Sequence, residues 1–404
     1  MSAQSGATTK LGTRAVDSHL VRPKAKTQPR IVLFSNTSWY LYNFRRQLLE
    51  RLRDSGFSVV LLSPKDDYTD ALVTAGFEWH EFKLDRRSVN PLSQVGVLVR
   101  LWRAFRSLKP DVVHLFTVKC VVLGGIASRI AGVPRRVHAI AGLGSVFSDS
   151  HRRALRAAVS FALRLATAGS GSAIIVQNPD DAKRLQLQGI APPDRIHLVR
   201  GSGVDGQRFH MRRDRTKEQR VRVLFAARLL KAKGVQDFVR IAKRTQTPDV
   251  EFLIAGERDP GNPDSVDESF LQHCTSVKNL RLLGHVDDMV SLLQSTSLVV
   301  LPSSYGEGVP RTLVESAAAS LPLVAYDVPG SREIIVDGHN GFLCPVGDFE
   351  ALAAAVQQLI ADPQLRERYS KASREHFETE YDEKTVNRKT LDIYRHLGAA
   401  GTAC

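Results

Sequence analysis

The chain of 404 residues has few of the features that mark disulfide-rich, zinc-binding or membrane-spanning proteins. Its four cysteines, Cys120, Cys274, Cys344 and Cys404, lie far apart and form no CxxC pair, which argues against a disulfide framework or a zinc site. No run of 18 apolar residues is without a charge, so we expect no membrane-spanning helix. The first 30 residues have no apolar core and do not resemble a secretory signal.

Several motifs of nucleotide-binding proteins and hydrolases are also missing. In neither half of the chain does GxGxxG follow the first strand, which counts against an enzyme that binds a nicotinamide or flavin dinucleotide. The patterns GxxxxGK[ST], GxSxG and HExxH do not occur. The acidic pairs Asp66–Asp67 and Asp287–Asp288 stand in turn-like sequence, where solvated or capping roles are more common than metal binding. We therefore expect no metal site and no cofactor.

The charge of the chain is unevenly distributed. The composition is that of a globular protein, with 43% hydrophobic and 24% charged residues and a net charge of +14. Residues 1–30 carry +5, residues 31–200 carry +11 and residues 201–404 carry −2. A basic half suggests an anionic partner, which could be nucleic acid, a membrane surface or a phosphorylated substrate. On charge alone, general solubility explains the excess equally well.

The order of strands and helices predicts an α/β fold with two doubly wound, Rossmann-like domains. Near-continuous apolar strands alternate with helices of ten or more residues, which is typical of parallel βαβ units. The Gly- and Arg-rich passage 201–215 interrupts this alternation and marks the domain boundary. We expect a disordered basic tail (1–29), an N-terminal domain (30–200), a C-terminal domain (201–382) and a C-terminal helix (383–404) that packs back on the first domain. The expected strands are 31–35, 57–63, 111–116, 135–141, 172–178 and 195–200, then 221–227, 250–256, 280–284, 298–302 and 321–326.

Two cations follow the first strand of the second domain. Arg228 stands at the carboxyl end of that strand, where open α/β sheets bind ligands, and Lys233 and Gly234 stand where the next helix begins. Cations beside a helix N-terminus suit a diphosphate whose charge grows as it leaves. A solvated, charged loop is the alternative explanation.

A pair of glutamates flanks the start of a later helix. Glu307 is expected in the loop after strand 298–302, and Glu315 on the second turn of the helix that follows. Both carboxylates could then accept hydrogen bonds from sugar hydroxyls in one crevice. Gly308 would let backbone N–H groups approach a phosphate, and Pro310 suits the first turn of the helix.

Together these motifs resemble the family 4 retaining glycosyltransferases of GT-B fold, in which two Rossmann-like domains face a central cleft. The resemblance rests on ARLLKAKG (227–234), LLGHVDD (282–288), EGVPRTLVE (307–315) and the stretch 321–343. In the first half, residues 38–60, 84–91, 112–133 and 140–147 are similar to the bacterial branch that extends undecaprenyl-diphosphate-linked glycans. The resemblance covers residues 30–390.

The resemblance implies a role for each matching residue. Arg228 and Lys233 would neutralise the nucleotide diphosphate, and Glu307 would hold the donor sugar, so these three form the expected catalytic set. The implied donor-binding set is Arg228, Lys233, Val286, Glu307, Gly308, Val309, Thr312, Leu313 and Glu315. Within this set, Val286 is at the position where the backbone of family members contacts the base of the nucleotide, and Glu315 would hold the ribose. The donor would be a UDP-sugar, with no metal.

The chain departs from the family pattern at one position. Many relatives carry a histidine just after the fifth strand of the first domain, where Ala141 stands here. We assign no catalytic histidine, and expect His138 and His114 to be core or strand-edge residues.

The acceptor is expected to be a lipid-linked sugar. Arg45, Arg86, Arg87 and Lys119 are expected at loop positions where they could meet its phosphates, and Gly142 and Gly144 belong to the IAGLG loop that faces the acceptor. Each cation could equally be a solvated side chain. The helical run 150–166 mixes basic and apolar residues and could lie at a membrane interface or in the core.

The leading interpretation is therefore a cytoplasmic, retaining glycosyltransferase on the inner face of the plasma membrane. It would move a sugar from a UDP-sugar to an undecaprenyl-diphosphate-linked glycan, with an anionic membrane surface as partner. The alternatives are a soluble enzyme with a non-lipid acceptor, a sugar-nucleotide epimerase or phosphorylase of the same architecture, and a nucleic-acid-binding protein. The last would need basic stripes with interleaved aromatics, whereas aromatics are only 7% and scattered, so we expect no nucleic-acid partner.

Overall fold

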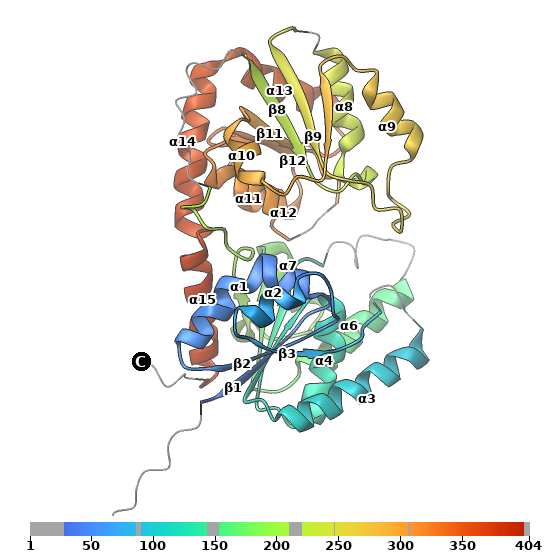
Figure 1. Ribbon diagram of the computed structural model, residues 1–404, viewed down its shortest axis with the longest axis vertical. Coiled ribbons are helices and arrows are strands. Elements are labelled where there is room, and N and C mark those ends of the chain that lie inside the picture. Colours follow the sequence, from blue (N-terminus) through green and yellow to red (C-terminus); the bar gives the residue numbers. More distant parts are fainter. Residues whose placement is uncertain are drawn as a thin grey trace, which may run out of the picture.

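The computed structural model describes residues 28–85, 90–143, 153–209, 220–245, 247–305 and 308–399. Within them the chain forms two α/β domains, one above the other in Figure 1. Each domain is a parallel sheet with helices on both faces, which confirms the predicted fold class. The expected basic tail lies outside the described residues as far as residue 27.

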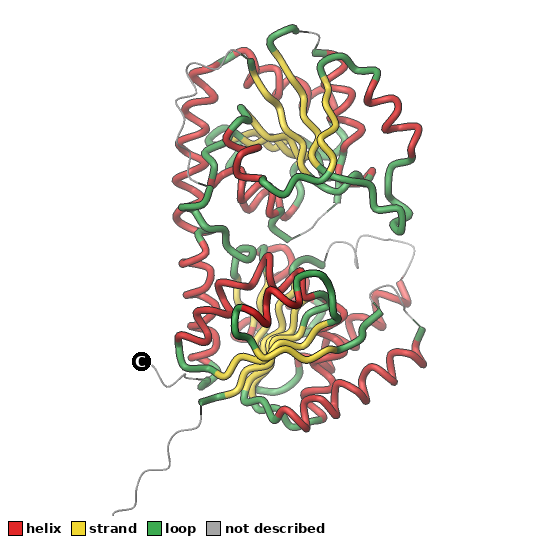
Figure 2. Tube along the Cα trace, viewed as in Figure 1, coloured by secondary structure: helices red, strands yellow, loops and turns green. Residues whose placement is uncertain are grey.

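The first domain contains a seven-stranded sheet in the order β3-β2-β1-β4-β5-β6-β7. Successive residues of a strand point to opposite faces, so Ile31 and Leu33 pack toward α1 and Val32 and Phe34 pack toward α3. All neighbouring strands are parallel, and their carboxyl ends meet at the edge that faces the second domain (Figure 2). The strands are β1 (Arg30–Phe34), β2 (Ser58–Ser63), β3 (Glu78–Glu81), β4 (Val112–Phe116), β5 (Arg135–Ile140), β6 (Ser172–Val176) and β7 (Ile196–Leu198). The helices are α1 (Ser38–Asp54), α2 (Thr69–Thr74), α3 (Pro91–Leu108), α4 (Val118–Ile130), α6 (Arg153–Thr167) and α7 (Pro179–Leu187).

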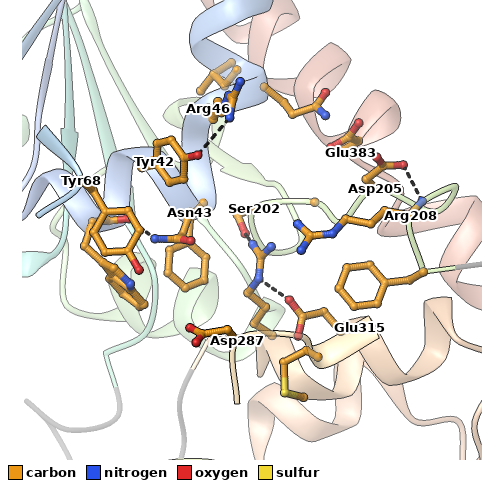
Figure 3. Close-up of a pocket in the computed structure, with 18 of the residues that line it drawn as sticks. Tyr42, Asn43, Arg46, Tyr68, Ser202, Asp205, Arg208, Asp287, Glu315 and Glu383 are labelled. Atoms are coloured by element: carbon orange, nitrogen blue, oxygen red, sulfur yellow. Dashed lines mark hydrogen bonds and ion pairs between the residues drawn. The ribbon is translucent and has the colours of Figure 1, made fainter. Parts of the chain in front are cut away.

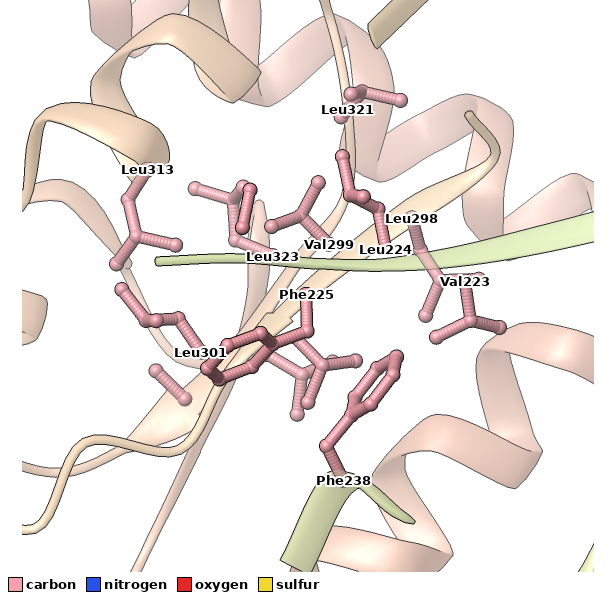
Figure 4. Packing of buried hydrophobic residues seen from close by; sticks show 14 of the residues in the cluster. Val223, Leu224, Phe225, Phe238, Leu298, Val299, Leu301, Leu313, Leu321 and Leu323 are labelled. Carbon is pink, nitrogen blue, oxygen red and sulfur yellow. The ribbon is translucent and has the colours of Figure 1, made fainter. Parts of the chain in front are cut away.

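The second domain contains a six-stranded parallel sheet in the order β10-β9-β8-β11-β12-β13. Its core is built from alternating strand residues and from helix residues such as Phe238, which packs on Phe225 of β8 (Figure 4). The strands are β8 (Val221–Ala226), β9 (Val250–Ala255), β10 (Leu280–Gly284), β11 (Leu298–Leu301), β12 (Leu323–Tyr326) and β13 (Gly341–Cys344). The helices are α8 (Val235–Arg244), α9 (Glu268–Thr275), α10 (Met289–Gln294), α11 (Arg311–Ala318), α12 (Pro329–Ile334) and α13 (Phe349–Ala361). In both sheets the strand order reverses beside the first strand, at β1/β4 and at β8/β11, which is where such sheets bind ligands.

Two long helices at the end of the chain join the domains. Helix α14 (Pro363–Glu380) packs on the second domain, and α15 (Glu383–His396) packs on α1 of the first (Figure 1). Tyr394 of α15 is 1% exposed and forms a 2.5 Å hydrogen bond with Nδ1 of His114 in β4. Between α14 and α15 the chain passes from the second domain to the first. It runs there beside residues 201–209, which lead from β7 toward the second domain, and the Glu383 amide donates to Val204 O (3.1 Å). We call these two stretches the interdomain segments.

Several elements were not predicted from the sequence. Helix α14, the short α2 and the strands β3 and β13 have no counterpart among the expected elements. β3, with the sequence EWHE, has no apolar run, because three of its four residues are charged or titratable and it lies at the sheet edge. Helix α1 begins at Ser38, where the Thr37 side chain caps it by accepting from Tyr40 N (3.1 Å).

Candidate active site

The two cations of the second domain both lie in the loop that follows β8. Arg228 follows β8, and its Nη1 lies 2.9 Å from Oδ2 of Asp259, while 59% of its side chain stays exposed. Lys233 ends the short 3-10 helix Lys231–Lys233, is 8% exposed, and has its Nζ 5.3 Å from the ring centre of Tyr305 in the loop after β11. Both side chains are thus near the β8/β11 switch point, the position that the sequence motif predicts for a phosphate group.

Gly234 brings the loop after β8 against the loop after β11. Its φ of +76° is in the left-handed region, and a Cβ there would lie 2.0 Å from the carbonyl oxygen of Pro302. Only glycine accommodates both constraints without moving backbone. Gly234 therefore fixes the distance between the loop that ends in Lys233 and the loop that leads to residue 307.

Helix α11 carries the remaining donor motif. Glu307 lies outside the described residues. Thr312 Oγ1 donates to Ala226 O of β8 (2.9 Å), and the Leu313 amide donates to Pro310 O (3.1 Å), within the first turn of the helix. Pro310 is the N-cap residue, one position before the place that we expected for it.

Glu315, the expected ribose ligand, is held by a neighbouring arginine. Its Oε1 lies 2.7 Å from Nε of Arg311, one helical turn earlier, and its side chain is 12% exposed. Arg311 also reaches out of its own domain: Nη1 is 3.2 Å from Oγ of Ser202, and the guanidinium carbon lies 4.6 Å from the ring centre of Phe44 in α1. Arg311 thus connects the expected ribose site to the interdomain segment and the first domain.

Gly308 and Val309, whose amides were expected to hold the donor sugar, contact the first domain directly. The Val309 amide donates to Oε1 of Gln177, just after β6 (3.1 Å). A Cβ on Gly308 would lie 2.1 Å from the carbonyl oxygen of Ala141, which follows β5, and equally close to Gln177 Oε1. Gln177 is 8% exposed and was not among the predicted site residues. Its position one residue after a buried parallel strand, facing the cleft, was the signal that could have identified it.

Two hollows lie between the domains at this level. The larger has a volume of about 530 Å³ and the smaller about 220 Å³. Figure 3 shows the larger one, where Tyr42 and Asn43 of α1 face Asp287 and Glu315 of the second domain. Val286 and Glu315 from the donor set line the larger hollow; Gly308, Val309, Ala141 and Gln177 line the smaller. Both hollows are bordered by the same four residues, Phe44, Ser202, Gly203 and Arg311.

Not all of the expected donor residues line these two hollows. Arg228, Lys233, Thr312 and Leu313 are not among the lining residues of either one. They lie instead around the β8/β11 switch point, where Thr312 binds the last residue of β8. The described donor residues thus form two groups: one lines the two hollows between the domains, and the other lies at the carboxyl ends of the strands of the second domain.

The larger hollow also holds charged residues of the interdomain segments. Asp205, Arg208 and Glu383 all line it, and Figure 3 shows Asp205 beside Glu383. Burial, together with the negative charges of Asp205 and Asp382, raises the pKa of Glu383 to about 7. The protonation of this carboxyl therefore changes near neutral pH.

The expected acceptor residues need correction. Arg45 is not in a loop: it lies within α1, is 6% exposed, donates to the Tyr40 hydroxyl (2.9 Å) and stacks over Phe116 (4.8 Å). Lys119 is on the first turn of α4, where its Nζ donates to Asp85 O. Arg45 is buried because it stands on the side of α1 that packs against Phe116 of β4.

The glycine loop and the remaining basic residues are only partly described. Gly142 follows β5 with a φ of +138°, which favours glycine. Arg86, Arg87 and Gly144 lie outside the described residues.

His138 and His114 lie in the core, as expected, rather than in the cleft. His138 in β5 has no exposed surface, and burial, with positive charge from Arg136 and Arg195, lowers its pKa to about 3. His114 in β4 is 1% exposed, and burial lowers its pKa well below the ordinary value. The His114 ring packs in the core and is hydrogen-bonded to Tyr394 through Nδ1, whereas neither ring nitrogen of His138 has a hydrogen-bond partner among the described residues, so this ring serves packing.

In the part of the chain that the structure describes, no group of three or more His, Cys, Asp or Glu side chains is arranged to hold a metal ion. Within the same residues, no helix combines the length and apolar character needed to cross a bilayer.

Comparison with known proteins agrees with this architecture. Residues 30–178 match the family model "Glycosyl transferase 4-like", and residues 207–376 match "Glycosyl transferases group 1". Among solved structures, HepE of Anabaena in complex with UDP has a TM-score of 0.73 at 19% identity, with 91% of this chain and 100% of that chain covered. The fold is therefore that of the GT-B glycosyltransferases.

Curated relatives extend the match over almost the whole chain. The N,N'-diacetylbacillosaminyl-diphospho-undecaprenol alpha-1,3-N-acetylgalactosaminyltransferase of Campylobacter jejuni is 25% identical over 90% of this chain and 98% of its own length. The UDP-Gal:alpha-D-GlcNAc-diphosphoundecaprenol alpha-1,3-galactosyltransferase of Escherichia coli is 25% identical over 79% of this chain and 84% of its own. The chain belongs to the family 4 glycosyltransferases of GT-B fold, with a 4-like first domain and a group 1 second domain.

Proposed function

We propose that this glycosyltransferase transfers a sugar, with retention of anomeric configuration, from a UDP-sugar to an undecaprenyl-diphosphate-linked glycan. The observation that carries the proposal is the meeting of the Gly308–Val309 segment with Ala141 and Gln177 across the cleft. A sugar held by the second-domain loop would thus stand directly against the first domain, where the acceptor enters. Relatives named for undecaprenyl-diphosphate-linked substrates support the choice of acceptor.

In the proposed reaction the enzyme supplies position and positive charge. The acceptor hydroxyl attacks the anomeric carbon from the face that the diphosphate leaves, and the departing phosphate oxygen accepts the hydroxyl proton. No general base from the protein is then required, which suits a cleft where Ala141 replaces a histidine. Arg228 and Lys233, at the ends of β8 and of the following 3-10 turn, would neutralise the charge that grows on the diphosphate.

Because two cations supply that charge, we propose that no metal ion is required. Chelation with EDTA should then leave the transfer rate unchanged. A loss of activity that Mg²⁺ or Mn²⁺ restores would contradict this part of the proposal.

The decisive experiment is a panel of UDP-sugars tested for thermal stabilisation of the protein and for slow donor hydrolysis. One or more donors should stabilise the wild type, and Arg228→Ala and Lys233→Ala should each lower the transfer rate by at least about 100-fold. Near-wild-type turnover in either variant would remove these residues from the mechanism. If no UDP-sugar produces a response, the donor class is wrong.

We propose a cytoplasmic location at an anionic membrane surface, since the acceptor would be anchored in the lipid bilayer. An enzyme that acts on a water-soluble acceptor is the second candidate. A lipid-linked acceptor that is turned over only in the presence of vesicles would distinguish the two.

A further inference from the structure

Three neighbouring helices on one side of the first domain, α3, α4 and α6, carry no negative charge. Helix α3 packs on α4 and α4 packs on α6, whereas α7, on the same side of the sheet, carries Asp180 and Asp181. The 46 residues of α3, α4 and α6 include eight lysines and arginines and no aspartate or glutamate. The opposite face differs, since α1, α2 and α15 carry Glu50, Asp54, Asp70, Glu383 and Asp392. We call the outer surface of α3, α4 and α6 the basic face.

The same face exposes large apolar side chains. On α3, Leu92 is 83% exposed, Val95 58%, Val99 39% and Trp102 36%, and their spacing of three or four residues places them on one stripe. This stripe is additional to the buried one, Val97, Leu101 and Phe105, which packs on the sheet. On α6, Phe161 and Leu165 are 61% and 41% exposed. A helix that only covers a sheet does not need a second apolar stripe.

Cations stand beside the exposed apolar residues. Arg100, Arg103 and Arg106 of α3 are all exposed. Arg100 donates to the carbonyl oxygen of Lys83 (3.3 Å), and its guanidinium carbon lies 5.4 Å from the ring centre of Phe82. Neither of these partners carries a negative charge, so neither neutralises the guanidinium. Apolar side chains next to arginines are the composition of a surface that lies in the headgroup region of an anionic bilayer.

The basic face has one end turned toward the second domain. The strands β3 and β5, which precede α3 and α6, end at the edge of the sheet that faces the second domain. Figure 1 shows both helices beginning at the same side of the first domain, with the start of each nearer the second domain than its end. Leu92 and Val95 stand near the start of α3, so the most exposed apolar residues lie at the end of the face that is nearer the second domain.

We infer that the basic face rests on an anionic lipid bilayer, with Leu92, Val95 and Phe161 inserted among the headgroups. The inference rests on the proposed function, because it explains how a lipid-anchored acceptor reaches the cleft without leaving the membrane. Lipid fits this surface better than a second copy of the chain, since two such faces would repel each other through their arginines. It also fits better than nucleic acid, since the apolar residues of the stripe are mainly aliphatic and do not stack on bases.

Vesicle flotation tests the inference. We would compare the wild type with the double variant Leu92→Glu/Val95→Glu on vesicles of phosphatidylglycerol and phosphatidylcholine in equal parts, and on phosphatidylcholine alone. Val73→Glu on α2 and Val346→Glu in the second domain are matched controls, because each is 50% exposed and lies away from the basic face. The double variant should lose at least about tenfold in affinity for the anionic vesicles, and the controls less than twofold. Binding of the wild type should weaken as salt screens the arginines.

Three results of these experiments would overturn the inference. A wild type that does not bind anionic vesicles, or a double variant that binds as well as the wild type, would show that the basic face does not contact lipid. A wild-type dimer that becomes a monomer in the double variant, measured by light scattering, would identify the face as a contact between copies. Donor hydrolysis without vesicles separates this inference from the proposed function: neither Leu92 nor Val95 lines the two hollows, so hydrolysis should be unchanged in the variant. Absence of hydrolysis in the wild type would count against the UDP-sugar donor alone.

Discussion

Gly308→Ala tests whether the contact between the donor loop and the first domain matters for catalysis. The new Cβ would lie 2.1 Å from the Ala141 carbonyl oxygen, whereas a carbon–oxygen contact settles at about 3.3–3.6 Å. The loop and the end of β5 must therefore separate by about 1 Å or more. A displacement of this size at a reacting centre costs roughly 100-fold in rate, so we expect kcat/KM to fall by about that factor.

The assay is the initial rate of transfer from the UDP-sugar that the panel identifies. Gly96→Ala is the matched control, because it adds the same methyl group on α3 where no atom lies within 4 Å, and it should keep wild-type activity. Adding Gln177→Ala to Gly308→Ala should not restore the rate, because the Ala141 carbonyl belongs to the backbone and cannot turn away. A Gly308→Ala enzyme within threefold of the wild type would refute the reasoning, as would rescue by the second substitution.

Two further predictions concern α15 and the interdomain segments. Since burial raises the pKa of Glu383 to about 7, the folded state holds its proton more tightly than the unfolded state, and this contribution to stability is lost as pH rises from about 4.5 to 7. The unfolding temperature of the wild type should therefore fall between pH 5 and pH 7.5 more than that of Glu383→Gln, and equal slopes would contradict the assignment. Tyr394→Phe removes the hydrogen bond to Nδ1 of buried His114 and should cost about 1–3 kcal/mol in denaturant unfolding, so a loss below about 0.5 kcal/mol would show that the bond adds little.

The sheets could be predicted from the sequence because their strands are buried and therefore apolar. The runs 31–35, 221–227 and 298–302 each agree with an observed strand to within one residue at either end. β3 and β13 were not predicted because edge strands keep polar or partly exposed residues, and a short run of this kind does not differ from a loop. Helix α14 has many charges and only a narrow apolar stripe, which packing on α11 and α13 completes.

The site could be predicted in part, because its motifs are local in sequence. The loop around Arg228, Lys233 and Gly234 and the helix that carries Glu315 follow strands directly, so their place at the sheet edge follows from the chain order. Gln177 could not be connected to Val309 in this way, since 132 residues separate them and only the packing of two domains brings them together. The burial of Arg45 depends in the same way on α15, which covers α1 from the far end of the chain.

The pairing of Arg311 with Glu315 links the nucleotide site to the arrangement of the domains. Arg311 uses one nitrogen for Glu315 and another for Ser202, and its guanidinium stacks on Phe44 of the first domain. A ribose that binds Glu315 would have to share this carboxylate with Arg311 or displace it. Displacement would also disturb the contacts of Arg311 with Ser202 and Phe44, which hold the first domain against α11. If the nucleotide shifts the equilibrium between two domain positions by a given factor, thermodynamic linkage requires that its affinities for those two positions differ by the same factor.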